Sequence, residues 1–172
     1  MDVLVIVLRI VHIFSGIFWV GFGLFNFFYF QPAIRATGAE GMAVMQHLNQ
    51  KTNLMPTVYL AATLTFLSGL GLFWPLAVSM PSTLHSSYGI VISVGSLSGI
   101  IAWLHAIFLV RKIISKIQVL GGQIQSQEGP PTPDQQSEMD ALASRLNRAG
   151  KMVIVFMVIA VFGMSIAQYV NF

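Results

Sequence analysis

The chain has no cysteine and few charged residues. Of its 172 residues, none is Cys and only 9% are Asp, Glu, Lys or Arg, whereas 55% are hydrophobic. The absence of cysteine excludes disulfides, thiolate metal sites and cysteine-ligated iron–sulfur clusters. Soluble domains carry about a quarter charged residues, so this composition predicts a membrane protein.

Acidic residues and catalytic motifs are also scarce. None of the six Asp and Glu residues lies well inside an apolar segment, which argues against carboxylate proton relays of the kind that pumps use. The sequence contains no Walker loop, no paired-carboxylate site and no nucleophile with an adjacent base. Side chains that form or break covalent bonds are therefore not expected in this chain, and whether the protein is an enzyme stays open.

Four long apolar segments make up most of the chain. A helix needs about 20 residues to cross a membrane, and these segments are close to that length or longer. We therefore expect an all-α fold, a four-helix transmembrane bundle that forms a single integral membrane domain over residues 1–172. The expected spans cover about residues 3–30, 56–78, 88–110 and 152–170.

Two polar connections join these spans. Residues 39–52 place apolar side chains on one face of a helix, which predicts a short interfacial helix. Residues 119–133 are rich in Gly, Pro and Gln, a composition typical of a linker. Thr132 and Pro133 then supply an N-cap and a favourable first residue for an amphipathic helix that leads into the fourth span.

The distribution of basic residues predicts the topology. Eight of the nine Lys and Arg residues lie in the 31–55 and 111–151 connections, and none lies in the 79–87 connection. By the positive-inside rule the first two connections are cytoplasmic and both termini are outside. The expected location is a bacterial-type plasma (inner) membrane. Because the cations flank membrane spans, a lipid bilayer is the expected partner and nucleic acid is not.

One line of polar and small residues runs along the first span. Its Arg and His are costly to hold in lipid, so this face requires a protein neighbour, a cofactor or water. Read at steps of three and four, the line is Arg9, His12, Gly16, Trp19, Gly23 and Asn26.

Small and hydroxyl residues also mark the second and third spans. Such residues let membrane helices approach closely and form hydrogen bonds across the gap. We expect them to mediate helix packing. They include Thr57, Ala61, Thr65 and Ser68 in the second span, and Ser93, Gly95, Ser96, Ser98 and Gly99 in the third.

Part of the line in the first span suits a porphyrin held edge-on between helices. His12 offers an axial iron ligand, and Gly16 removes a side chain that would block the ring. Trp19 can stack on the ring, and Arg9 can pair with a propionate. The same glycine also suits plain helix–helix contact.

A second iron ligand is less evident. His105 in the third span is the alternative metal ligand, or it snorkels toward the cytoplasmic surface. The first and third spans run in the same direction, and at ~1.5 Å rise per residue the depths of His12 and His105 differ by ~12 Å. A five-coordinate haem, a ligand from a partner or a dimeric site therefore fits better than a His12–His105 pair.

The first span contains the stretch HIFSGIFWVGFG, with His12, Trp19, Gly21 and Gly23. This stretch resembles the first-helix signature of HemJ-type protoporphyrinogen oxidases and their CopD-like copper-resistance relatives. The resemblance covers the first span well and the four-span layout loosely. It implies a small helical membrane protein that binds haem b through His12. The HemJ type has a functional lysine in a later span, whereas the third span here has no basic residue before Arg111. The resemblance thus supports haem binding more than oxidase activity.

Three functions remain open at this point. The leading hypothesis is a b-type haem protein in electron transport or haem handling. The alternative is a non-catalytic accessory transmembrane subunit of a larger respiratory or photosynthetic complex. Copper transport or resistance is weaker: Met42, Met45 and His47 offer soft ligands, but apolar packing at the membrane surface also explains them. A homo-oligomer or other membrane subunits are expected as protein partners.

Overall fold

The structure, a computed structural model, describes residues 2–127 and 129–170, and this part of the chain contains helices and no strand. The predicted all-α fold is confirmed. The elements are α1 (Val3–Phe25), the π-helical turn η1 (Asn26–Phe30), α2 (Gln31–Ala36), α3 (Ala39–Lys51), α4 (Leu54–Ser79), the 3-10 turn η2 (Pro81–His85), α5 (Ser87–Leu104), the π-helical turn η3 (His105–Val110), α6 (Arg111–Ser126), α7 (Pro133–Ile166) and the 3-10 turn η4 (Ala167–Tyr169).

Four helical runs are long and apolar enough to cross a membrane, as the sequence predicts. Each covers one of the predicted spans, the fourth to within one residue of its end, so the protein is a multi-pass membrane protein whose surroundings are a lipid bilayer. The runs are Val3–Ala36, Leu54–Val78, Ser87–Ser126 and Pro133–Tyr169.

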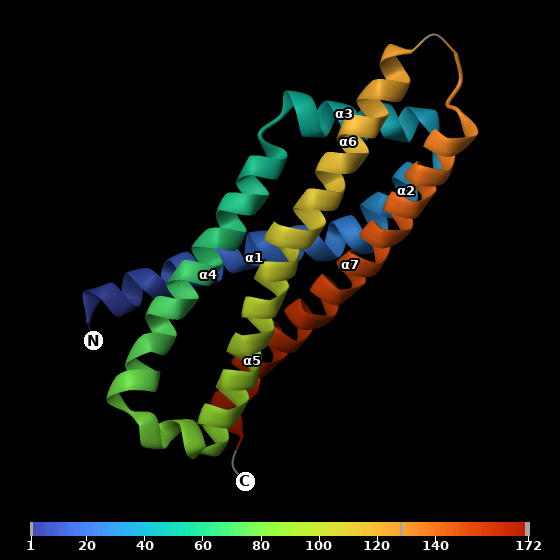
Figure 1. Cartoon of the computed structure of the whole chain (residues 1–172). Helices are drawn as coiled ribbons and strands as arrows, with labels where there is room; N and C mark the ends of the chain where they lie inside the picture. The colour runs from blue at the N-terminus through green and yellow to red at the C-terminus, as the bar shows by residue number, and fades with distance from the viewer. Residues whose placement is uncertain (1, 128, 171–172) are drawn as a thin grey trace.

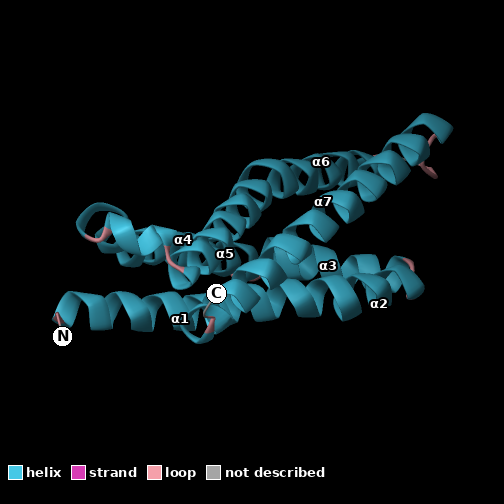
Figure 2. Cartoon of the chain, turned by 90° about the horizontal axis from the view of Figure 1, so that it is seen from below, coloured by secondary structure: helices cyan, strands magenta, loops and turns pink. Residues whose placement is uncertain are grey.

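Different elements lie at the two ends of the bundle (Figure 1). α3 and the turn between α6 and α7 lie at one end, and η2 and the C-terminal end of the chain lie at the other. α1 and α2 form one rod that crosses the other long helices obliquely and lies to one side of them (Figures 1 and 2). The 31–55 and 111–151 connections therefore share an end of the bundle.

The first helix continues past Gln31-Pro32, where the sequence predicts its end. The backbone amide of Gln31 donates to the carbonyl of Asn26, five residues earlier. This π turn alters the hydrogen-bond register just before Pro32, where a proline ring would otherwise clash with the preceding turn of an α-helix. The helix can thus run on to Ala36.

The predicted polar linker over 119–133 is helical in its first half. α6 extends to Ser126 because its apolar residues, spaced three and four apart, pack on α7. Ile113 and Leu120 are buried in one cluster with Leu142. The pairing of α6 with α7, which a composition-based reading does not detect, keeps these residues helical.

α7 begins at the predicted cap. The Thr132 hydroxyl accepts a hydrogen bond from the Gln135 amide at 3.2 Å, and the Gln135 side-chain oxygen accepts one from the Thr132 amide at 2.9 Å. This reciprocal pair is a capping box. α3 matches the interfacial helix predicted at 39–52, and Gly38, with φ of 58°, makes the turn before it.

The four spans meet around one tryptophan. Trp19 on α1 is 7% exposed and packs in one cluster with Ala62 of α4, Ala102 of α5 and Met157 of α7. Three of these four residues come from different helices that are distant in sequence from α1. The cluster therefore makes the long helices one bundle.

α5 and α7 approach each other closely enough for backbone contact. A Cβ atom added at Gly163 would lie 3.1 Å from the Cα atom of Gly95, and one added at Gly95 would lie 3.1 Å from the Met164 amide nitrogen. Membrane helices gain van der Waals contact when small residues allow such an approach. Gly95, one of the small residues predicted to mediate packing in the third span, does so here.

Candidate functional site

The His12 side chain is bound to the backbone of α4. Its Nδ1 atom lies 2.9 Å from the carbonyl oxygen of Thr65 and 3.4 Å from the Ser68 hydroxyl. A carbonyl oxygen only accepts hydrogen bonds, so Nδ1 carries the proton and donates it to Thr65. Nε2 makes no hydrogen bond with any described residue. His12 is thus held in one tautomer with the Nε2 lone pair available.

Gly69 allows the imidazole to reach this carbonyl. A Cβ atom at Gly69 would lie 2.9 Å from Cε1 and 3.2 Å from Nδ1 of His12. Any side chain at this position would push the ring away from α4. Gly69 follows Thr65 by one helical turn, so both residues share one face of α4. The carbonyl and the space beside it form a single binding position for His12.

Hydroxyl groups extend this polar contact between α1 and α4. The Thr65 hydroxyl lies 2.9 Å from the Ser15 hydroxyl and 2.8 Å from the carbonyl of Ala61. Ser15 donates to the carbonyl of Val11 at 2.5 Å, so toward Thr65 it can only accept, and the single Thr65 hydroxyl proton is shared between Ser15 and the Ala61 carbonyl. Each interhelical hydrogen bond in a membrane contributes on average about 0.6 kcal/mol. The polar contact fixes the register of α1 against α4.

The four residues predicted to surround a cofactor lie in different environments along α1. Gly16 faces α4, where an added Cβ atom would lie 3.6 Å from the Thr65 methyl group. Trp19 belongs to the buried core. Arg9 is exposed on α1. The room beside Gly16 is therefore taken by α4 and Trp19 is part of the core, and Nε2 of His12 is left without a hydrogen bond to any described residue.

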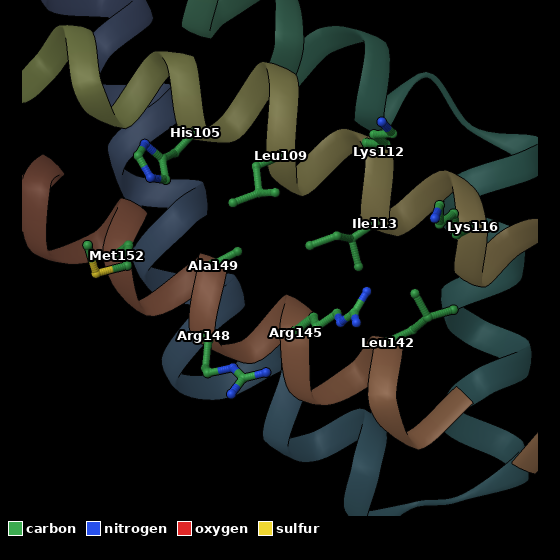
Figure 3. A pocket seen from close by; sticks show the side chains of 10 residues that line it. All are labelled: His105, Leu109, Lys112, Ile113, Lys116, Leu142, Arg145, Arg148, Ala149 and Met152. Carbon is green, nitrogen blue, oxygen red and sulfur yellow. The ribbon is translucent and has the colours of Figure 1, made fainter. Parts of the chain in front are cut away.

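His105 lies in a different environment. It begins the π turn η3, and its Nδ1 atom is 3.1 Å from the carbonyl of Ile101 on its own helix. Its ring lies 6.3 Å from the ring of Phe156 on α7, whereas His12 contacts α4. Figure 3 shows His105 with Met152 at one end of a cavity between the η3–α6 run and α7.

The remaining metal candidates stay separate. No group of three or more His, Asp or Glu side chains suited to a metal ion occurs among residues 2–127 and 129–170. His47, which sequence analysis grouped with two methionines, is exposed on α3. The side chain of Met42 lies outside the described part of the chain. The copper alternative therefore gains no further support from this geometry.

Sequence reasoning identified Thr65 and Ser68 as packing residues but not their partner. Ser15 and Gly69 were not among the residues predicted from the sequence. Ser15 follows His12 by three positions, and Gly69 follows Thr65 by four. That spacing is the only sequence signal for them.

Comparisons of the chain with known protein families, with curated proteins and with solved structures found no match. The chemistry assigned to His12 and to the cavity beside His105 therefore rests on the residues described above.

Proposed function

We propose that this membrane protein binds b-type haem and acts in electron transfer or haem handling, with Nε2 of His12 as an axial iron ligand. The observation that supports this most is the 2.9 Å hydrogen bond from His12 Nδ1 to the Thr65 carbonyl. Histidines that bind metals almost always donate their other ring nitrogen to a carbonyl, carboxylate or water, which fixes the ring and makes it more basic. Haem, when bound, supplies one-electron redox chemistry.

The rest of the chain fits this ligand role from the exposed side of α1. Ile13, which directly follows His12, is 55% exposed and offers apolar surface to the edge of a macrocycle. Arg9, exposed one turn before His12, is suited to pair with a propionate. In this proposal Gly16 and Trp19 act through packing, because they hold α1 against its neighbours. His105 is not assigned a ligand role.

A site on the exposed face of α1 is incomplete without a neighbour. The proposal therefore includes a second copy of the chain, or another membrane subunit, that covers this face and supplies any second ligand. It also places the protein in a bacterial-type plasma membrane with both termini outside, on the basis of its basic connections. The resemblance of the first span to the HemJ-type and CopD-like proteins supports the same ligand.

The test is a reduced-minus-oxidised absorption spectrum of the purified protein, recorded together with the amount of protein inserted in the membrane. Wild type is expected to show a haem b spectrum. His12→Ala removes the ligand but makes α1 more apolar, so it should insert normally and lose or alter the spectrum. His105→Ala is the matched control, since it removes another part-buried intramembrane histidine, and it should leave the spectrum unchanged.

The outcomes separate the competing functions. Wild-type haem content in His12→Ala would refute the ligand assignment. A colourless protein that purifies only with other subunits would support the accessory-subunit alternative. Bound copper without haem would support copper transport or resistance.

A further inference from the structure

A basic cavity lies where the third and fourth spans continue beyond their apolar parts. Its volume is about 410 Å³, within the range of about 300–1,000 Å³ found for small-molecule sites. The cavity lies between the η3–α6 run and α7 (Figure 3). His105 and Met152 lie at one end of it, and Lys116 and Leu142 lie at the other.

The lining of this cavity combines cations with apolar side chains. Lys112 and Lys116 come from α6, and Arg145 and Arg148 come from α7. In Figure 3 the guanidinium of Arg145 lies between the two helices, near Ile113. No acidic residue lines the cavity in the part of the chain that the structure describes. Its four cations therefore have no carboxylate within the cavity to neutralise them.

Apolar side chains line the cavity together with these cations. Ile113 and Leu142 are 8% and 5% exposed, and belong to the cluster that holds α6 to α7. Leu109 and Met152 extend the apolar lining toward the membrane-spanning parts of the two helices. A soluble anion such as phosphate would use only the cations. A ligand with an anionic head and an apolar tail would use both parts of the lining.

The cavity lies at the depth where such ligands occur. The run Ser87–Ser126 has 40 residues, which at about 1.5 Å per residue is roughly 60 Å, or twice the thickness of the hydrocarbon layer. The run is apolar up to Val110 and basic from Arg111 onward. Its basic part therefore begins at the boundary between hydrocarbon and lipid headgroups, where Lys and Arg are attracted to anionic lipids.

We infer that this cavity is a binding site for an anionic phospholipid. The phosphate lies among Lys112, Lys116, Arg145 and Arg148, and the start of an acyl chain lies along Leu109 and Met152. Such a lipid reduces the repulsion among these four cations, which line one cavity. It also stabilises the pairing of these helices beyond the membrane. This site uses none of the residues assigned to haem, so either proposal can fail alone.

The experiment measures lipid retention by the full-length protein. Delipidated protein in an uncharged detergent is titrated with dioleoyl-phosphatidylglycerol or dioleoyl-phosphatidylcholine, and bound lipid is counted by native mass spectrometry. Wild type should bind the anionic lipid at least about tenfold more tightly. Each cation near the surface contributes about fivefold, so the Arg145→Gln/Arg148→Gln variant should lose about 25-fold for this lipid and little for the other. Lys151→Gln is the matched control.

Lys151 lies on α7 three residues after Arg148 and does not line the cavity. Its substitution should change binding less than about twofold. If the double variant does not fold, Arg145→Gln alone and a roughly tenfold rise in salt, which screens exposed charges, provide the same comparison in a folded protein.

Three results would overturn the proposal. The first is equal retention of the two lipids by wild type. The second is a loss in Lys151→Gln as large as in the double variant, which would indicate a general basic surface. The third is displacement of the lipid by inorganic phosphate but not by sodium chloride of equal ionic strength, which would identify a free-phosphate site instead.

Discussion

Gly69→Ala tests whether the open space on α4 is needed to hold His12. The added methyl group would lie 2.9 Å from Cε1 of His12, so the imidazole must move away from the Thr65 carbonyl. The lost interhelical hydrogen bond costs about 0.6–1.7 kcal/mol, and overpacking costs about 1–3 kcal/mol. Alanine recovers about 1 kcal/mol through its helix propensity. We expect a net destabilisation of about 0.6–3.7 kcal/mol.

The measurement is unfolding in mixed micelles with increasing dodecyl sulfate, followed by circular dichroism. Gly21→Ala is the matched control, because it is also a helical glycine but an added Cβ atom there would meet nothing within 4 Å. It should be at least as stable as wild type, with a gain of up to about 1 kcal/mol from helix propensity. If His12 is also the haem ligand, Gly69→Ala should in addition shift or weaken the haem spectrum.

A double-mutant cycle tests the cause directly. In a His12→Ala background the methyl group at position 69 no longer meets the imidazole, so Gly69→Ala should cost much less than in wild type. Contacting residues show coupling of about 0.5–3 kcal/mol, whereas independent sites are additive. Equal stability of Gly69→Ala and Gly21→Ala, or additive effects in the cycle, would refute the proposed role of Gly69.

Three further predictions concern the bundle. Gly95→Ala should destabilise the protein by about 1–3 kcal/mol in the same unfolding assay, since its Cβ atom would meet the α7 backbone at 3.1 Å. Gly99→Ala is the control and should be tolerated, because the nearest neighbour of its Cβ atom would lie at 3.7 Å. Trp103→Phe should unfold at or above the wild-type midpoint because Nε1 of Trp103 is buried and has no hydrogen-bond partner among the described residues, which costs about 1–3 kcal/mol. A midpoint clearly below wild type would contradict this. Reporter fusions should be cytoplasmic near Glu128 and external after Phe172 and in the 79–87 connection; an external reporter near Glu128 would reverse the proposed topology.

The helical class and the spans could be read from the sequence because both depend on local properties. Backbone groups in lipid must form hydrogen bonds within their own segment, so long apolar runs become helices. The capping box at Thr132 is likewise local, since donor and acceptor lie three residues apart. Helix ends depended more on context. A π turn carried the first helix through Pro32, and packing on α7 kept α6 helical to Ser126.

The polar line on α1 was visible in the sequence, but its neighbours were not. His12 and Thr65 are 53 residues apart, and nothing in either helix indicates which face of the other it meets. Only the crossing of α1 and α4 decided that α4 fills the space beside Gly16 and binds His12 through Nδ1. The basic cavity was hidden for the same reason. The sequence shows two groups of cations, and only the pairing of α6 with α7 places Lys112 and Arg145 around one space.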